Sequence, residues 1–402
     1  MKAAGVVVEY NPLHNGHVHH LKETRRLTGA EVVVAVMSGN FLQRGEPAFI
    51  DKWSRTELAL RSGADIVFEL PYRFAVAQAS EFAEGAIGIL AAARCSAFCF
   101  GSEDGRIGPF MNTLRLLEDQ KAVYEAEVRR LVKTGISYPS ALSRAYLSVA
   151  DAETHQDPLA DLTKPNNILG FHYMKAARSS GTGMTAFTVG RTGTGYHELG
   201  ADPDSGIMSA TAIREAVRQA GITDEVLRAV PDHTVRVLNS FREEYGQFGG
   251  WDRFWPILRT IIIRDGALRL GNIAEMTEGL EHRIVRAALA APTFTEFMEA
   301  VKTKRYTWTR IQRILTHVLC GIDSGEFSRF REPRYLRLLG MTQAGRSYLN
   351  LYKDDFGLPL VSRAASSDDP MLATDIRASD LYALGTGEKP GKDFRTPPIM
   401  TG

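Results

Sequence analysis

The hydrophobic positions of the first half of the chain form short continuous runs, which alternate with stretches of helical spacing. The runs predict strands, and they lie at 6–8, 31–37, 65–70, 97–100 and 185–189. Strands that are apolar on both faces and alternate with helices form parallel sheets covered by helices. We therefore predict an α/β domain with a Rossmann-like parallel sheet over residues 1–220.

The second half of the chain has apolar residues mainly at helical spacing. The helices predicted from this spacing lie at 225–245, 254–263, 283–299 and 304–318. We predict a mainly α-helical region over residues 221–402. The stretches 111–133 and 141–149 have the same spacing, so a helical insertion is expected near 106–160. The tail from Lys389 is rich in Pro and Gly, and we expect it to be mobile or loosely packed.

The stretch after the first predicted strand carries candidate chemistry. The strand stops at residues 10–12 (Tyr-Asn-Pro), and helical spacing begins after Gly16. His14 and His17 therefore fall at a helix start, where unpaired backbone N–H groups and the helix dipole attract phosphate. Gly16 allows close backbone approach, and two imidazoles can donate to phosphate oxygens. This stretch predicts a nucleotide-binding site.

A long polar loop, 38–47, follows the second predicted strand. Ligands of open parallel sheets bind beyond the carboxyl ends of the strands, where strand order reverses. We expect this loop, with Ser38 and Asn40, to bind a second substrate. A solvated loop ordered by glycine turns is the alternative.

Three other segments are expected at the same edge of the sheet. Gly101 follows the fourth strand, where a base or ribose can pack on bare backbone, or where a turn requires glycine. Arg191 follows the fifth strand, and its guanidinium can bind phosphate or ribose. Asn166 or Asn167 is predicted to cap a helix that continues through 173–178, and simple capping explains this pair as well as a ligand contact does.

A second phosphate site is predicted at 209–214. Ser209 and Thr211 lie at the start of a helix, with Arg214 one turn further on. Two hydroxyls at a helix N-terminus and a guanidinium can hold a polyphosphate. A capping serine before an ordinary helix is the alternative.

These two patterns resemble the signatures of the HIGH-type nucleotidyltransferases, relatives of the class I aminoacyl-tRNA synthetases. His-x-Gly-His stands at 14–17, and Ser-x-Thr-x-x-Arg stands at 209–214. The resemblance implies that both histidines contact a triphosphate and stabilise charge at its α-phosphate while a nucleophile displaces pyrophosphate. It also implies that the second signature grips the β- and γ-phosphates.

A narrower resemblance rests on six segments. They are EYNPLHNGH at 9–17, MSGNFLQRGEP at 37–47, FGSE at 100–103, PNNILG at 165–170, Arg191 with GYH at 195–197, and SATAIR at 209–214. Together they are similar to the tRNA(Met) cytidine acetate ligases. That resemblance implies that acetate and ATP form acetyl-adenylate, which acetylates the wobble cytidine of elongator tRNA(Met) to N4-acetylcytidine.

The resemblance also implies the residues of the site. His14 and His17 are the expected catalytic residues. The expected ATP-binding residues are Val7, Val8, Glu9, Tyr10, Asn11, Pro12, Leu13, His14, Asn15, Gly16, His17, His20, Gly101, Asn166, Asn167, Arg191, Ser209, Thr211 and Arg214. Mg²⁺ is expected with ATP, without a dedicated metal site in the protein.

The helical half contains a local excess of positive charge. Residues 301–350 include ten Lys and Arg against three Asp and Glu. Lys304, Arg305, Arg310 and Arg313 are interleaved with two aromatic residues. Cations neutralise phosphates and rings stack on unpaired bases, so the segment is predicted to bind tRNA. A solvated basic helix face is the alternative.

Composition narrows the class of protein further. The 48 Lys and Arg balance 47 Asp and Glu, which argues against a uniformly basic surface. No apolar run is long enough for a membrane span, and no signal peptide is recognisable. Cys95, Cys99 and Cys320 do not fit a disulfide framework or a zinc site. We expect three buried thiols, a cytoplasmic location, and no membrane or obligate protein partner.

Two alternatives share the predicted nucleotide site. An adenylyltransferase acting on a small phosphorylated metabolite would carry both signatures but would not need the basic helical half. A noncatalytic nucleotide-sensing, RNA-binding protein would bind the nucleotide without chemistry, which His14, His17 and Arg214 argue against. Pyrophosphate release separates the enzymes from the sensor, and dependence on acetate separates the two enzymes.

Overall fold

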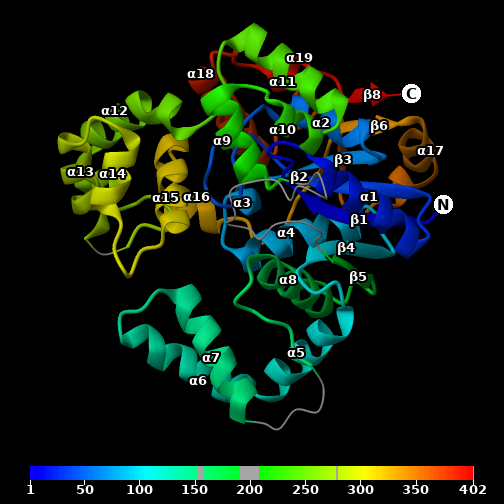
Figure 1. Ribbon diagram of the computed structural model, residues 1–402, viewed down its shortest axis with the longest axis horizontal. Helices are drawn as coiled ribbons and strands as arrows, with labels where there is room; N and C mark the ends of the chain where they lie inside the picture. Colours follow the sequence, from blue (N-terminus) through cyan, green and yellow to red (C-terminus); the bar gives the residue numbers. More distant parts are fainter. Residues whose placement is uncertain (153–157, 191–207, 278, 402) are drawn as a thin grey trace.

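The computed structural model describes residues 1–152, 158–190, 208–277 and 279–401. Its centre is a mostly parallel sheet in the order β5-β4-β1-β2-β3-β6-β7, with β8 paired to β6 (Figure 1). The strands are β1 (Ala3–Val8), β2 (Val32–Ser38), β3 (Ile66–Leu70), β4 (Ala97–Ser102), β5 (Thr185–Gly190), β6 (Leu336–Thr342), β7 (Leu360–Val361) and β8 (Ile399–Thr401). The α/β fold with a helical C-terminal region is confirmed.

All five predicted strands are present, and β1 to β5 pair in parallel. Alternate residues of β2 belong to two different cores, with Val32 and Val34 on one face and Val33 and Ala35 on the other. Both faces are therefore buried, which explains why the strands appear as continuous apolar runs. Strand order reverses between β1 and β4, so the predicted ligand edge lies where these strands end.

Helices cover both faces of this sheet. The face of Val32 packs against α4 (Ala79–Ala92), α8 (Pro165–Ser179) and α17 (Gln343–Tyr352). The other face packs against a second set, which is α1 (Asn15–Thr28), α2 (Lys52–Arg61), α9 (Ala210–Ala220), α10 (Asp224–Ala229) and α11 (Asp232–Tyr245). A short helix, α3 (Tyr72–Ala75), follows β3.

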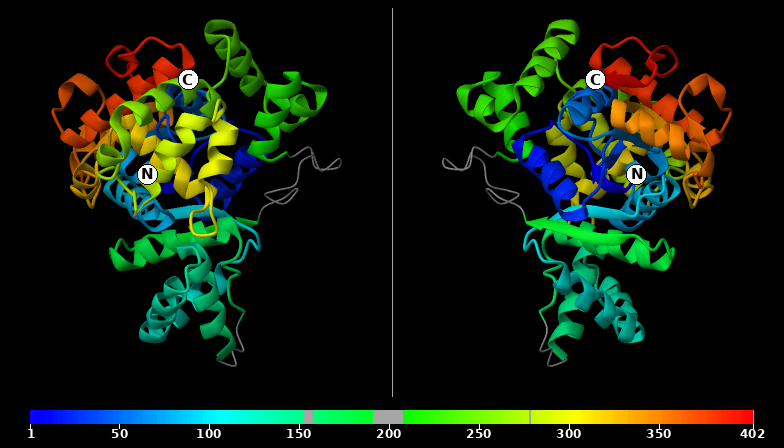
Figure 2. Two further views of the ribbon diagram at one scale, coloured as in Figure 1. Left: turned by 90° about the vertical axis from the view of Figure 1, so that its left-hand side faces the viewer. Right: turned by 90° about the vertical axis from the view of Figure 1, so that its right-hand side faces the viewer.

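The helical segment near 106–160 projects away from the sheet (Figure 2). It contains α5 (Ile107–Asp119), α6 (Lys121–Lys133) and α7 (Tyr138–Ala152). The stretch 111–133 is thus divided between two helices, which meet at Gln120. The α6–α7 pair has a small core of its own, formed by Val128, Leu131, Ala141 and Ala145.

Beyond residue 250, helices form a block at one end of the sheet (Figure 1). They are α12 (Trp251–Leu270), α13 (Leu280–Ala290), α14 (Phe294–Val301), α15 (Trp308–Cys320) and α16 (Ser324–Ser328). The helix α18 (Pro370–Thr386) packs against α12 and α15, and α19 (Lys392–Arg395) lies next to α11 (Figure 1). Pro231 and Pro292 divide the predicted helices 225–245 and 283–299, because proline lacks the N–H that a helix interior needs. None of the helices in the described ranges is long and apolar enough to cross a membrane.

Three strands of the C-terminal region join the sheet, which the helical pattern did not predict. β6 pairs antiparallel to β3, and β7 and β8 pair with β6. β7 and β8 have only two and three residues, so they carry too few apolar positions for a period to be read.

The expectation of a mobile tail after Lys389 is wrong. Asp393 is buried, and its carboxylate lies 2.8 Å from the buried Lys52 ammonium and 3.7 Å from the Arg337 guanidinium. Lys52 also lies 2.8 Å from Glu69. We call Lys52, Glu69, Arg337 and Asp393 the buried ion network. Glycine and proline shape turns here, but the charge of Asp393 anchors the tail.

Candidate active site

The two histidines lie at the start of α1 in a reciprocal cap. His14 is the N-cap residue, and its Nδ1 accepts the Gly16 N–H at 3.1 Å. His17 Nδ1 accepts the backbone N–H of His14 at 3.3 Å, and the two rings stack at 3.8 Å. Because both Nδ1 atoms accept hydrogen bonds, each neutral ring carries its proton on Nε2. Both imidazoles are thus set as donors to an anion.

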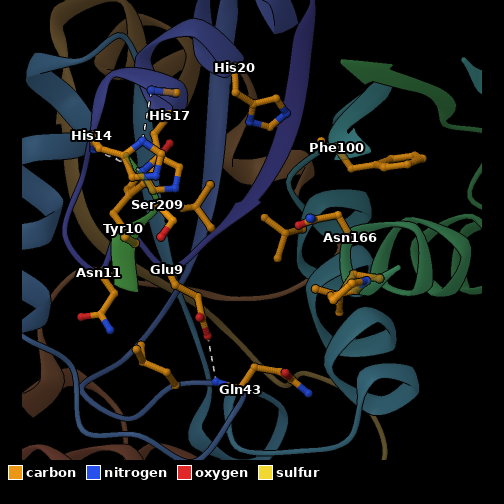
Figure 3. A pocket seen from close by; sticks show the side chains of 18 of the residues that line it. Glu9, Tyr10, Asn11, His14, His17, His20, Gln43, Phe100, Asn166 and Ser209 are labelled. Carbon is orange, nitrogen blue, oxygen red and sulfur yellow. Dashed lines mark hydrogen bonds between the residues drawn. The ribbon is translucent and has the colours of Figure 1, made fainter. Parts of the chain in front are cut away.

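These histidines line a cavity of about 580 Å³ beyond the carboxyl ends of β1, β4 and β5 (Figure 3). Its size is that of a small-molecule site. The predicted residues that line it are Val7, Val8, Glu9, Tyr10, Asn11, His14, Gly16, His17, His20, Gly101, Asn166, Ser209, Thr211 and Arg214. Pro12, Leu13, Asn15 and Asn167 do not line it. Arg191 lies outside the described residues.

The second signature, at residues 209–214, lines the same cavity as the histidines and contacts the loop before them. Ser209 caps α9, where its Oγ accepts the Ala212 N–H at 3.1 Å. Arg214 donates to the Asn11 carbonyl at 2.7 Å and lies 3.4 Å from the Glu46 carboxylate. The arginine therefore links the helix start of α9 to the loop that precedes α1. Two anion-binding helix N-termini open on one cavity.

The asparagine pair does not cap α8, so that expectation is wrong. Lys164 is the N-cap residue, and Asn166 and Asn167 lie inside the first turn. The Glu103 carboxylate accepts the backbone N–H groups of both asparagines, at 3.3 and 3.0 Å. A carboxylate from another segment thus accepts hydrogen bonds from the unpaired N–H groups of this helix start. Asn167 is fully buried and donates to the Asp161 carbonyl, whereas Asn166 reaches the cavity.

The loop 38–47 borders the cavity through its second half. Leu42, Gln43, Arg44 and Glu46 line it, but Ser38 and Asn40 do not. Ser38 Oγ lies 3.4 Å from the Glu9 carboxylate. Asn40 is buried, where it donates to Ser379 and accepts the Lys52 N–H. Ser38 and Asn40 therefore stabilise the loop through hydrogen bonds, outside the lining of the cavity.

Arg55 fixes the base of this loop. Its buried guanidinium donates to the backbone carbonyls of Glu9, Ser38, Gly39 and Ile50. The carboxyl ends of β1 and β2 are thereby tied to α2. Five N–H donors in a rigid plane make arginine suited to such a multiple contact.

Comparisons with known proteins agree with this geometry. A family model described as HIGH Nucleotidyl Transferase matches residues 1–395. The tRNA(Met) cytidine acetate ligase of Lysinibacillus sphaericus is 46% identical over 99% of this chain and 100% of its own length. The Bacillus subtilis protein of that name is 40% identical over 98% of this chain and 95% of its own length.

This chain belongs to the tRNA(Met) cytidine acetate ligase family. The crystal structure of Thermotoga maritima TmcAL bound with alpha-thio ATP matches this chain with a TM-score of 0.88 and 32% identity. The match covers 100% of this chain and 99% of the Thermotoga maritima chain. The apo structure of that protein matches with a TM-score of 0.90 and 31% identity. The resemblance inferred from the six sequence segments is therefore confirmed.

An aromatic wall of the cavity was missed in the sequence. Phe82 on α4, Phe100 on β4 and Tyr173 on α8 line the cavity, and Figure 3 shows Phe100 across the cavity from the histidines. Asn166, Leu169 and Tyr173 stand at helical spacing on one face of α8, and that spacing was a signal available in the sequence. The site residues expected from the ligase family did not include these three aromatic positions.

The basic residues near α15 fall into two environments. Lys304 and Arg305 are exposed on the turn before α15. Arg313 is only 12% exposed and pairs with Glu275 at 2.8 Å. Arg310 is half-buried and donates to the Glu275 carbonyl at 3.4 Å. Lys304 and Arg305 face solvent, whereas Arg310 and Arg313 join α15 to the segment before α13.

The same helix touches the cavity loop. Gly45 has φ +76°, and a Cβ there would lie 2.3 Å from the Arg313 backbone nitrogen. Thr316 Oγ1 donates to the Gly45 carbonyl at 2.7 Å. Only glycine combines this backbone conformation with this close approach. The basic region of the chain is therefore packed directly on the loop that borders the cavity.

The three cysteines are free and buried, as expected from the sequence. Burial raises the pKa of the Cys99 thiol to about 11 and that of Cys320 to about 12. Thiols with raised pKa values are poor nucleophiles at neutral pH. The cavity lining contains no cysteine in the described part of the chain.

Proposed function

We propose that this protein is an ATP-dependent ligase that converts the wobble cytidine of elongator tRNA(Met) to N4-acetylcytidine. Acetate and ATP first form acetyl-adenylate. The observation that carries the proposal is the pair of imidazoles at the start of α1. Their Nδ1 atoms accept backbone N–H groups, so their protons are on Nε2, and they line the same cavity as the second signature. The names of the full-length relatives and the alpha-thio ATP bound in the Thermotoga maritima structure support it.

In the first step, His14 and His17 would stabilise negative charge at the α-phosphate. An acetate oxygen attacks this phosphorus, and pyrophosphate leaves. Ser209, Thr211 and Arg214 would hold the β- and γ-phosphates at the start of α9. Arg214 already binds the Asn11 carbonyl, so a phosphate on this guanidinium would lie close to the histidine loop.

Magnesium would be held chiefly by the triphosphate. Mg²⁺ commonly binds through substrate phosphates and retains several waters. Among the described residues, no group of three His, Cys, Asp or Glu side chains could hold a metal ion. The positive helix termini and the metal would share the neutralisation of the triphosphate.

In the second step, the N4 amine of cytidine attacks the acetyl carbon and AMP leaves. Residues 1–220 would perform this chemistry, and residues 221–402 would bind the tRNA. Lys304 and Arg305 are exposed and would contact phosphates, while Arg310 and Arg313 would stabilise the segment that carries them. Ser38 and Asn40 would act on the second substrate indirectly, through the loop they hold.

The test is pyrophosphate release from ATP by the purified protein under three conditions. These are no acid, acetate alone, and acetate with tRNA that lacks the modification. We expect release that depends on acetate and an acetylated cytidine in the tRNA digest. Release that requires a phosphorylated metabolite instead of acetate would identify a different adenylyltransferase. ATP binding without release in any condition would identify a nucleotide sensor.

A further inference from the structure

Glu9 belongs to the segment expected to bind ATP, but a carboxylate repels the negative charges of a triphosphate, so phosphate binding does not explain its place in the cavity. It follows β1 directly and lies at the cavity floor, where its side chain points toward Gln43 (Figure 3). Its Oε1 accepts the Gln43 N–H at 2.8 Å and lies 3.4 Å from Ser38 Oγ. Oε2 has no hydrogen-bond partner among the described residues. One carboxylate oxygen is thus fixed, and the other is available to a ligand.

The aromatic wall stands beside this carboxylate. The rings of Phe82 and Phe100 lie 6.5 and 6.3 Å from the ring of Tyr173. The negative charge of Glu9 contributes to the raised pKa of Tyr173, so the two side chains are electrostatic neighbours. An aromatic wall and a hydrogen-bonding group at its edge are the elements that bind a base taken out of its stack.

We propose that Glu9 and this aromatic wall form the binding site for the target cytosine, and that Glu9 Oε2 accepts the proton of the N4 amine. The exocyclic amine is the hydrogen-bond donor of cytosine, and a carboxylate is its natural acceptor. This inference rests on the proposed function and assigns the second half of that reaction to a residue.

Atoms and electrons balance in this transfer. The N4 lone pair attacks the acetyl carbonyl carbon, and a C–N bond forms. The bond from that carbon to the adenylate oxygen breaks, and its electron pair leaves with AMP. One N4 proton passes to Glu9 Oε2 and then to water. No oxidant, reductant or further reactant is needed.

The surroundings of Glu9 suit a base. Burial raises the pKa of the Glu9 carboxyl above its ordinary value, while the Gln43 N–H and the charges of Arg44 and Arg55 partly oppose the shift. Glu46 in the same loop acts in the raising direction, and Tyr173 faces the carboxyl from α8. A base is most effective when its pKa approaches the working pH.

Glu9→Gln separates the two halves of the reaction. The amide keeps the shape and can accept a hydrogen bond, but it does not take up the proton. We expect single-turnover transfer from added acetyl-adenylate to tRNA to fall by about 10²-fold or more. Acetate-dependent exchange of pyrophosphate into ATP should fall at least tenfold less than transfer. Glu84→Gln is the matched control, because Glu84 also has a raised pKa but does not line the cavity.

A pH profile gives a second readout. Wild-type transfer should rise with pH through one ionisation, which Glu9→Gln abolishes and Glu9→Asp shifts. Equal losses of transfer and exchange, or a wild-type profile without that ionisation, would overturn the assignment of Glu9. Failure of the wild-type protein to acetylate tRNA at all would instead overturn the proposed function. The wild-type profile decides the question even if the glutamine variant does not fold.

Discussion

The buried ion network and the cavity both contain ionisable side chains, but these side chains have different partners in the two places. In the buried ion network, Lys52 lies 2.8 Å from both Glu69 and Asp393, so each charge faces an opposite charge. In the cavity, Glu9 Oε2 and the Nε2–H groups of the histidines are directed by backbone partners on their other atoms. The comparison teaches that residue type does not mark a site. The partners of each side chain and the direction of its donors and acceptors do.

The first prediction breaks the network. Lys52→Met would remove the nearest cation of the buried Glu69 and Asp393 and leave only Arg337, which lies 3.7 Å from Asp393; removing one partner of a buried ion pair costs about 3–5 kcal/mol. Urea unfolding measures the loss. Lys22→Met on the exposed face of α1 is the control and should change stability by less than about 0.5 kcal/mol. Equal stability of the two variants would show that the network contributes nothing.

The second prediction breaks the cavity. His14→Ala and His17→Ala should each lower adenylation by about 10²–10³-fold, equivalent to about 2.7–4 kcal/mol of transition-state stabilisation. His14→Asn sharpens the test, because asparagine also caps helices and should preserve the stability of α1. Adenylation near the wild-type rate in both alanine variants would remove the histidines from the mechanism.

The third prediction concerns a histidine outside both groups. Burial lowers the pKa of His317 to about 3, and its Nδ1 lies 2.9 Å from the Tyr72 hydroxyl. The unfolded chain therefore binds a proton more readily than the folded chain between about pH 6.5 and 3, so stability falls as the pH falls through this range. Between pH 7 and pH 4 the loss should be on the order of 3 kcal/mol.

Denaturant unfolding at several pH values measures this loss. His317→Gln keeps a hydrogen-bonding group without the titration and should flatten this part of the profile. His282 is 70% exposed, and His282→Gln should leave the profile unchanged. A profile that is the same in wild type and His317→Gln would assign the acid sensitivity to other groups.

The smallest expected effect lies at the exposed cations. Lys304→Ala with Arg305→Ala should weaken tRNA binding about tenfold and reduce the salt slope by about two, because each of the two cations would neutralise one phosphate. ATP binding should not change. The control is Arg346→Ala with Lys353→Ala. This double variant removes two exposed cations from α17 and the turn that follows it. If tRNA binding had the same salt dependence in both double variants, Lys304 and Arg305 would not contact the tRNA.

The sequence predicted the parts of the fold that are periodic and local. Continuous runs such as 31–37 and helix starts such as Ser209 depend on neighbouring residues, and the structure confirms both. The strand β6 was missed because its pairing with β3 joins residues more than 260 positions apart. Asp393 was likewise placed in a loose tail, since nothing near it indicates that Lys52 is its partner.

The same division holds for the site. Both signatures were found because each lies within a few residues of the chain, and together they line the cavity. The wall of Phe82, Phe100 and Tyr173 comes from three elements that meet only after folding. The fixed and free oxygens of Glu9 depend on a hydrogen bond from Gln43, 34 residues away. Sequence motifs therefore located the histidine side of the cavity better than its aromatic wall.

The central claim is that the cavity joins acetate to the α-phosphate of ATP. Acetate labelled with ¹⁸O in both carboxylate oxygens tests it most directly, with the label followed by mass spectrometry through one round of tRNA acetylation. The account predicts one ¹⁸O atom in AMP for each acetylated cytidine, because the carboxylate oxygen that attacks phosphorus leaves with it. Label in inorganic phosphate, or AMP without label, would contradict the account.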